Sequence, residues 1–138
     1  MIQSTPEADS RLAALRSLFG DAVSTDEDEL HRVSFDGLKL SFPAEAVVRP
    51  VKEEQVGELL RLANQRKTPV TTRGVGSSLT GSATPVHGGW VLDLSRMNTF
   101  SIDREERICV AQAGAVVTDL QRAAEEFGLY YPPDPASK

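Results

Sequence analysis

The sequence predicts one domain of mixed α/β (α+β) class, in which a small, partly parallel sheet is flanked by helices. Two short apolar segments, residues 45–50 and 68–73, enclose a helical pattern at 52–67. A strand, a helix and a strand in this order within roughly 30 residues form a βαβ unit, for which a parallel strand pair with a right-handed crossover is expected. The glycine-rich stretch "TTRGVGSSLTG" at 71–81 follows the second strand, which is where α/β folds place ligands.

Length and composition fit this class. A chain of 138 residues buries roughly two-thirds of its unfolded surface, enough for a core of its own. The net charge of −5 argues against nucleic acid or an anionic membrane as the main partner. Residues 41–98, which contain the glycine-rich stretch, are the one segment with a positive balance, +2. This favours an anionic ligand only weakly, because random scatter explains it as well.

The N-terminal residues 1–40 are expected to form a helical lead-in to a domain at 41–138. In a helix at 6–19, four apolar residues fall on one face: Ala8, Leu12, Leu15 and Phe19. Its ends carry an N-cap residue, a proline at the first position and a glycine beyond the last turn, namely Thr5, Pro6 and Gly20. A short helical turn is also predicted at 28–33.

The βαβ helix at 52–67 has apolar residues at helical spacing, Val56, Leu59, Leu60 and Ala63, but no Ser, Thr, Asp or Asn to cap it. A strand at 89–95 places Trp90, Leu92 and Leu94 on one face. Residues 99–114 are then expected to form a hairpin that turns near 104–106. In a last helix at 116–127, the residues expected to face inward are Val116, Leu120, Ala123, Ala124 and Phe127.

The chain has one cysteine, Cys109, so an intrachain disulfide is excluded. Its position in a predicted strand favours a packed core thiol over a reactive one. No apolar run approaches the ~20 residues that a membrane span needs, and the N-terminus lacks the basic and apolar segments of a signal peptide. The expected localisation is therefore cytoplasmic.

The glycine-rich stretch fits neither of the two best-known phosphate-binding patterns. The dinucleotide pattern G-x-G-x-x-G, started at Gly74, requires a glycine where Leu79 stands. The P-loop pattern starts at Gly76 and Gly81, but Ser82 and Ala83 follow where lysine and Ser/Thr belong. Glycines still allow free backbone N–H groups to converge on an anion. Composition alone therefore leaves an anion-binding loop and a structural turn equally favoured.

Together with its flanks, the stretch resembles the FAD-linked oxidase family, also called the p-cresol methylhydroxylase or vanillyl-alcohol oxidase type. The ordered matches are "VSFDG", similar to a Tyr-Ser-x-Asp segment, then "FPAEAVVRPVKEEQVGELLRLANQRKTPVTTRGVGSSLTG", and then "GGWVLDLSRMNTFSIDREERICVAQAGAVVTDLQRAAEEFGLYYPPDPAS". They cover about residues 28–138 and are nearest to the glycolate oxidase subunit and D-lactate dehydrogenase branch. The resemblance implies that 41–138 is the first subdomain of an FAD-binding domain.

The resemblance also implies a cofactor, its site and a reaction. The candidates for binding the FAD pyrophosphate are Arg73, Gly74, Val75, Gly76, Ser77, Ser78 and Gly81. Ser77 stands where covalently flavinylated relatives carry histidine, so FAD is expected to be held non-covalently. The segment expected near the flavin and ribityl chain comprises Pro133, Asp134, Pro135 and Ser137. The reaction expected of the complete enzyme is hydride transfer from a 2-hydroxy acid to FAD.

The resemblance assigns no catalytic residue and no metal ligand to this chain, because the second FAD subdomain and the substrate domain of the family would follow Lys138. His31 and His87 match no catalytic position and are interpreted as solvated loop residues, and Asp93 and Asp103 as strand-end residues. The chain alone is expected to be inactive and to bind FAD weakly. Two alternatives stay open: a non-catalytic interaction module that uses "LYYPP", and a regulator that binds another phosphate ligand.

Overall fold

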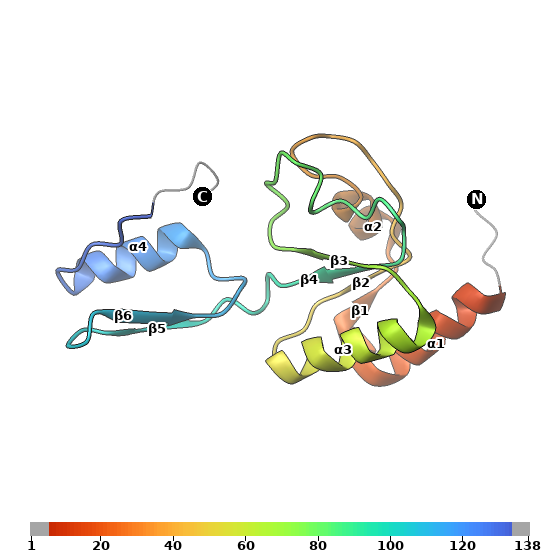
Figure 1. Cartoon of the computed structure of the whole chain (residues 1–138), viewed down its shortest axis with the longest axis horizontal. Helices are drawn as coiled ribbons and strands as arrows, with labels where there is room; N and C mark the ends of the chain where they lie inside the picture. Colours follow the sequence, from red (N-terminus) through yellow and green to blue (C-terminus); the bar gives the residue numbers. More distant parts are fainter. Residues whose placement is uncertain (1–5, 134–138) are drawn as a thin grey trace.

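A computed structural model describes residues 6–133, which form two parts that lie side by side (Figure 1). The first part, here called the body, comprises residues 6–94 and contains a four-stranded sheet between helices. The second part, here called the arm, comprises residues 99–133 and contains a two-stranded hairpin with one helix. The α/β class with a small mixed sheet flanked by helices is confirmed.

The body sheet has the strand order β1-β2-β4-β3. Its strands are β1 (Val23–Ser24), β2 (Ala46–Val48), β3 (Val70–Arg73) and β4 (Trp90–Asp93). The βαβ unit is present, but its strands β2 and β3 are not neighbours, because β4 lies between them and runs parallel to both. The two strands of the βαβ unit therefore run parallel, as expected, but they do not pair with each other. Residues 90–92 of β4 place apolar side chains on both faces of the sheet. Because β4 lies inside the sheet, the side chains on both faces are buried.

Helices cover both faces of this sheet (Figure 1). On one face lie α1 (Pro6–Phe19) and α3 (Glu53–Arg66), and on the other lies α2 (Glu27–Val33). The larger core cluster joins Leu15 and Phe19 of α1 to Leu59 and Leu62 of α3 and to the sheet residues Ala46, Val48, Trp90 and Leu92. The predicted bounds of α1 are confirmed, its predicted N-cap Thr5 lies outside the described residues, and α1 belongs to the same core as the βαβ unit.

One inward residue of α3 was predicted wrongly. Leu60 is 44% exposed, while Leu62 is buried in its place. The helix starts without a capping side chain, as expected, but Gln55 accepts hydrogen bonds from the backbone N–H groups of Val51 at 2.8 Å and Lys52 at 3.2 Å. A glutamine at the third helical position thus satisfies the backbone N–H groups just before the helix begins.

The arm consists of β5 (Phe100–Asp103), β6 (Ile108–Ala111) and α4 (Val117–Glu126). The predicted turn is confirmed, and Asp103 Oδ1 accepts from the N–H groups of Glu105 and Glu106 within it. The predicted core thiol is wrong, because Cys109 is only partly buried. Its neighbours Ile108 and Val110 are 55% and 69% exposed.

Two residues at the ends of α4 were also assigned wrongly to its buried face. Val116 is 37% exposed and Phe127 is 43% exposed, whereas Leu120 and Ala124 are buried as predicted. The physical reason is the same as for Cys109: the arm is one hairpin and one helix, so no second layer covers the outer surfaces of either. Among the described residues, no helix is long and apolar enough to cross a membrane.

Candidate functional site

The site is built on the connection between β3 and β4, which leaves the carboxyl end of β3 and carries the glycine-rich loop (residues 74–82). Gly76 and Gly81 have φ values of +78° and +76°, in the left-handed region that other residues rarely adopt. These two glycines let the chain reverse direction twice within a few residues. The local sequence thus produces a tight turn that displays its backbone.

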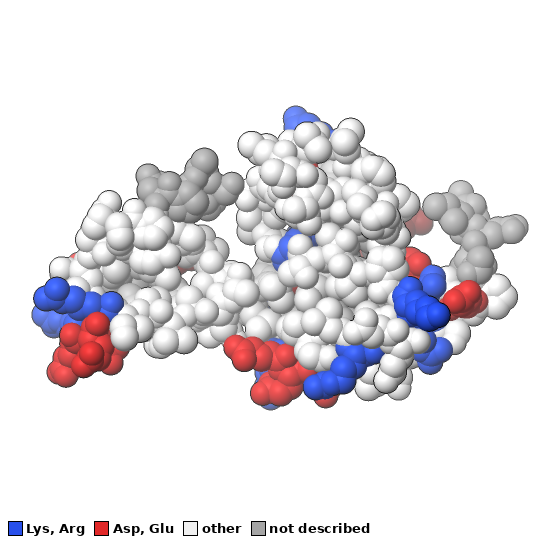
Figure 2. All heavy atoms as spheres, viewed as in Figure 1, with Lys and Arg blue, Asp and Glu red and all other residues white. Residues whose placement is uncertain are grey.

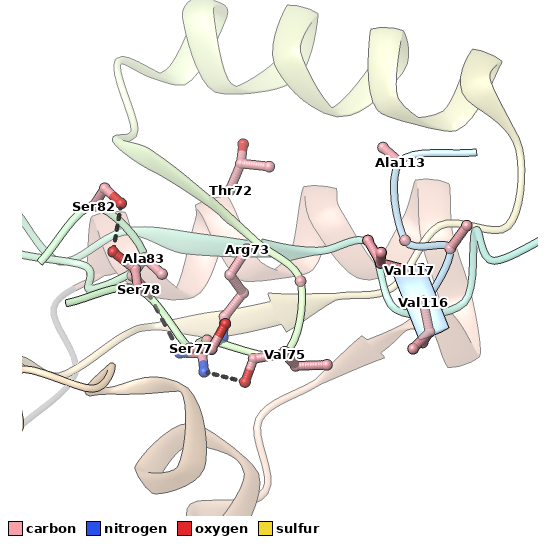
Figure 3. A pocket seen from close by; sticks show the side chains of 14 residues that line it. Thr72, Arg73, Val75, Ser77, Ser78, Ser82, Ala83, Ala113, Val116 and Val117 are labelled. Atoms are coloured by element: carbon pink, nitrogen blue, oxygen red, sulfur yellow. Dashed lines mark hydrogen bonds between the residues drawn. The ribbon is translucent and has the colours of Figure 1, made fainter. Parts of the chain in front are cut away.

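The loop forms one wall of a cleft of 390 Å³. The opposite wall is residues 113–117, which lead into α4, and Figure 3 shows Val116 and Val117 across from the loop. Gly114 lets this wall pack closely against the chain that follows β4, because a Cβ there would lie 1.9 Å from the Leu94 carbonyl oxygen. The sequence analysis did not identify this second wall, although the small residues of "AQAGA" are the signal that could have found it.

The loop has free hydrogen-bond donors that face no partner within the protein. Among the described residues, the backbone N–H groups of Val75, Gly76, Ser77 and Ser78 donate to no protein acceptor. Four successive N–H groups of this kind in a turn form a positively polarised concavity that suits an anion. An uncharged, glycine-rich surface also allows a large ligand to approach the backbone closely.

Arg73 lies beneath the loop, with its side chain 7% exposed. Its Nη1 donates to the carbonyl oxygens of Val33 at 2.9 Å and Phe35 at 3.0 Å, and its Nη2 to that of Val75 at 3.4 Å. Figure 3 shows this side chain turned toward the underside of the loop. Burial lowers the pKa of Arg73, and the nearby Asp93 opposes that shift. The guanidinium therefore binds the backbone of the protein.

Asp36 lies behind the same loop and is 3% exposed. Its Oδ1 accepts from the backbone N–H of Leu38 at 2.9 Å. Burial alone would raise the pKa of Asp36, but hydrogen bonds, chiefly from the N–H groups of Leu38 and Ala83, outweigh it and hold the pKa below its usual value. Asp36 lies in the segment "VSFDG", whose sequence alone predicts no role for it, whereas its contacts in the structure place it against the loop.

The remaining predicted site residues are placed as follows. Ser77 is exposed, and the hydroxyl of Ser78 lies 3.0 Å from Thr80 Oγ1 and 2.9 Å from Ser82 Oγ. The carbonyl of Pro133 accepts from Gln121 Nε2 of α4 at 3.0 Å. Three predicted residues, Asp134, Pro135 and Ser137, lie outside the described residues.

On the face drawn in Figure 2, most charged side chains lie away from the loop. Figure 2 shows them at the tip of the hairpin and along the edge formed by α1 and α3, while the surface around the loop is largely uncharged. His87 is exposed, as predicted, and His31 is exposed on α2, where its ring meets the edge of Phe35. Asp93 and Asp103 both end strands, as predicted. A ligand in the cleft between the loop and residues 113–117 would therefore meet mostly backbone groups, whereas a second cleft beside residues 73–76 is lined by the charged side chains of Arg32, Asp36 and Lys39.

Comparison with known families gives the site its context. Residues 44–138 match the family described as FAD binding domain. The chain belongs to this FAD-binding family. The match includes β2, α3, the glycine-rich loop and the whole arm, so both walls of the cleft lie inside the FAD binding domain.

Curated relatives confirm the branch that the sequence suggested. The glycolate oxidase subunit GlcD of Bacillus subtilis (strain 168) is 36% identical over 94 residues, which are 67% of this chain and 20% of that protein. D-lactate dehydrogenase of Anaerostipes hadrus is 35% identical over 130 residues, 92% of this chain and 26% of the relative. D-2-hydroxyglutarate dehydrogenase of Stutzerimonas stutzeri (strain A1501) is 37% identical and covers 83% and 25%.

Solved structures agree with the fold. A 4-ethylphenol oxidase from Gulosibacter chungangensis superposes with a TM-score of 0.80 at 25% identity, covering 96% of this chain and 27% of that one. p-Cresol methylhydroxylase with substrate bound gives 0.78 at 26% identity, covering 91% and 26%. The resemblance to FAD-linked oxidases is confirmed. The FAD-binding chain spans about a quarter of the length of these relatives.

The loop of this FAD-binding chain presents backbone donors that are compatible with an anionic group such as a pyrophosphate. A pyrophosphate offers several anionic oxygens, and the loop offers consecutive free N–H donors with no acidic side chain among residues 74–82. The cleft lining, which includes Thr72, Ser77 and Ser82, adds hydroxyl groups but no carboxylate. No feature of the described loop opposes an anion.

Proposed function

We propose that this chain binds FAD through the glycine-rich loop, and that it serves a flavin-dependent oxidoreductase acting on 2-hydroxy acids. The observation that carries the binding proposal is the set of four unpartnered N–H groups, Val75 to Ser78, at the edge of the cleft. Gly74, Gly76 and Gly81 supply the backbone freedom that brings these groups close to the phosphates. Family membership supports FAD as the ligand.

Arg73 and Ser77 take different parts in this proposal. Arg73 supports the loop from beneath, because its guanidinium is already bound to carbonyl oxygens. Ser77 lies exposed on the loop and lacks a ring nitrogen that could join the flavin, so the cofactor is held without a covalent bond. Acid precipitation of loaded protein should then release all of the flavin into the supernatant.

The proposed domain organisation follows from the same reading. Residues 41–138 form the first FAD subdomain, residues 1–40 lead into it, and the segment of Pro133, Asp134, Pro135 and Ser137 lies near the flavin. In a flavoenzyme of this type FAD also contacts further protein domains, so the 138 residues alone bind it weakly and carry no catalytic residue.

The proposed reaction is the oxidation of a 2-hydroxy acid to a 2-oxo acid. FAD, when bound, supplies the oxidant that accepts a hydride from the carbon bearing the hydroxyl group, while the hydroxyl proton passes to a base. The similarity to proteins named glycolate oxidase subunit, D-lactate dehydrogenase and D-2-hydroxyglutarate dehydrogenase supports this substrate class. The part of this chain is to hold and orient the cofactor.

A thermal-shift and equilibrium-binding series tests the loop. FAD and ADP, which contain the pyrophosphate, should stabilise the chain, whereas riboflavin should not. Gly76→Val should remove the effect, because the position has φ +78° and a Cβ there would meet Arg73 Nη2 at 1.7 Å. Gly57→Ala, in α3, is the control that should bind like the parent. Equal binding of riboflavin and FAD, or full binding by Gly76→Val, would contradict the proposal.

A non-catalytic interaction module is the second candidate function, and one observation favours it. The arm exposes apolar side chains, with Val110 69% and Tyr130 79% exposed, and such surfaces favour association with another protein surface. A specific protein complex together with no response to FAD or ADP would support this candidate over flavin binding. A response to ATP or FMN equal to that for FAD would instead indicate a regulator with another phosphate ligand.

A further inference from the structure

The segment at residues 33–37, between α2 and β2, lies directly behind the glycine-rich loop. In some of its hydrogen bonds the segment accepts, through backbone carbonyl oxygens, and in another it donates, through a backbone N–H. Arg73 Nη1 donates to the carbonyl oxygens of Val33 and Phe35 in the segment and, at 3.4 Å, to that of Ala83 just after the loop. One guanidinium therefore ties both ends of the loop to the same short segment.

The segment also holds the middle of the loop. The backbone N–H of Gly37 donates to the carbonyl oxygen of Ser78 at 2.8 Å. Beside it, the buried carboxylate of Asp36 accepts from the backbone N–H of Leu38 at 2.9 Å, while its Oδ2 has no hydrogen-bond partner among the described residues. Contacts with the loop are close enough that a Cβ on Gly37 would lie 2.7 Å from Leu79 Cδ2 and 2.8 Å from Ser78 O.

These contacts fix the direction of two N–H groups of the loop, those of Gly76 and Leu79. In a planar trans peptide the carbonyl and the following N–H point in opposite directions. Arg73 holds the Val75 carbonyl to the rear of the loop, so the N–H of Gly76 points to the front. Gly37 holds the Ser78 carbonyl to the rear in the same way, so the N–H of Leu79 points away from the segment.

We propose that residues 33–37 are a positioning element for the cofactor loop, in which Gly37 and Asp36 together with Arg73 orient the loop N–H groups toward the bound pyrophosphate before it arrives. The inference rests on the proposed function, since it gives these residues a role in the same FAD site. Donors that are oriented in advance do not have to be ordered when the ligand binds, so affinity increases. None of these residues needs to touch FAD.

The decisive variant is Gly37→Ala. The φ of Gly37 is not in the left-handed region, so alanine suits the local backbone, and its Cβ acts by displacing Ser78 and Leu79. We expect FAD and ADP affinities to fall by a common factor of at least ten. In spectra of the ligand-free chain, the amide signals of Gly76 and Leu79 should shift, while that of Val91 in the sheet stays in place.

Asp36→Asn is the second variant, in case Gly37→Ala does not fold. Asparagine can still accept from the Leu38 N–H, but it removes the negative charge of the buried carboxylate behind the loop, whose Oδ2 has no hydrogen-bond partner among the described residues. We again expect weaker binding of FAD and ADP and shifted amide signals of Gly76 and Leu79, with smaller changes than for Gly37→Ala. Gly57→Ala is the matched control, because a Cβ there meets only the flexible Arg61 side chain at 3.7 Å and should leave affinity and amide signals unchanged.

The outcomes separate this inference from the function on which it rests. If the parent chain binds neither FAD nor ADP, even at millimolar ligand, the proposed function fails and the inference fails with it. If the parent binds and both variants bind equally well, with unshifted loop amides, only the positioning role is overturned. Weakened ADP binding with shifted loop amides in either folded variant supports it.

Discussion

Strands β4 and β6 have the same length and similarly apolar sequences, "WVLD" and "ICVA", but opposite surroundings. Every residue of β4 is buried, whereas three of the four residues of β6 are exposed. The difference comes from the layers around each strand: β4 has a strand on both sides and helices on both faces, and β6 has one neighbouring strand and α4. An apolar composition thus permits a strand to form, but the strands and helices that pack around it determine whether its side chains are buried.

The comparison divides the molecule into two kinds of structure. The body contains both core clusters and has helices on each side of its sheet. Two residues of the described arm are buried, Leu120 and Ala124, and a cleft of 560 Å³ lies between its hairpin and α4. Since apolar burial is the main stabilising contribution, we expect the body to account for most of the free energy of unfolding.

Of the substitutions that test this comparison, Val91→Ser in β4 should lower the free energy of unfolding the most. Val91 is fully buried in β4, so the change exposes no surface but removes apolar contact and buries a hydroxyl. We expect the free energy of unfolding to fall by about 2–4 kcal/mol, from lost apolar burial and an added polar group. Urea denaturation measures it. Val91→Ala should cost less, and a loss from Val91→Ser below that of Val91→Ala would argue against this account.

Glu29→Gln should have a smaller effect, which depends on pH. Hydrogen bonds from Ser24 and Arg49 lower the pKa of Glu29 in the folded chain. A carboxylate with a lowered pKa stabilises the fold above its unfolded pKa of about 4.3, and that stability is lost as the pH falls through the folded pKa. The variant should therefore be less stable than the parent at pH 7, by less than about 1 kcal/mol because the pair is partly solvated.

Denaturation from pH 7 to pH 2 checks this prediction. The difference between parent and Glu29→Gln should shrink once the pH is below about 4. Glu126→Gln in the arm is the control, since Glu126 is exposed and has no ion pair among the described residues. A stability difference between parent and Glu29→Gln that stays constant over the whole range would contradict the role given to the ionised carboxylate.

Val110→Ser should have the smallest effect, although it is the same chemical change as in β4. Val110 is 69% exposed on β6, so little apolar contact is lost and the hydroxyl stays in water. The free energy of unfolding should change by no more than about 0.5 kcal/mol. A loss as large as that of Val91→Ser would show that β6 is covered in solution, for example by a second copy of the chain, which sedimentation would detect.

Local pattern predicted the elements of the fold well and their neighbours less well. The helix at 6–19, the βαβ unit and the hairpin turn follow from short-range spacing and end signals, which act within a few residues. The insertion of β4 between β2 and β3 is a long-range choice, and the two-residue strand β1 is too short to leave a pattern. Cys109 and Phe127 were assigned to a core because periodicity shows which face is apolar and not whether another layer covers it.

The candidate site likewise has features that local sequence predicts and features that depend on long-range contacts. The loop was found because glycine spacing after a strand is a local signal, and the ordered flanking motifs identified its family. The second wall at 113–117 and the support from Asp36 and Gly37 depend on contacts between segments about 40 residues apart. No single-sequence pattern encodes such contacts. The predicted FAD-binding residues remain a prediction, and three of them, Asp134, Pro135 and Ser137, lie outside the described residues.

The central position of β4 has a consequence for synthesis of the chain. Strands β2 and β3 emerge first, and neither has its parallel neighbour until residues 90–93 have followed. Until then the nascent chain presents two open strand edges and the apolar faces of α1 and α3, a state prone to aggregation. Trp90 closes both edges at once, because it pairs in register with Ala46 on one side and Val70 on the other. The body therefore becomes foldable in one late step, when its last strand leaves the ribosome.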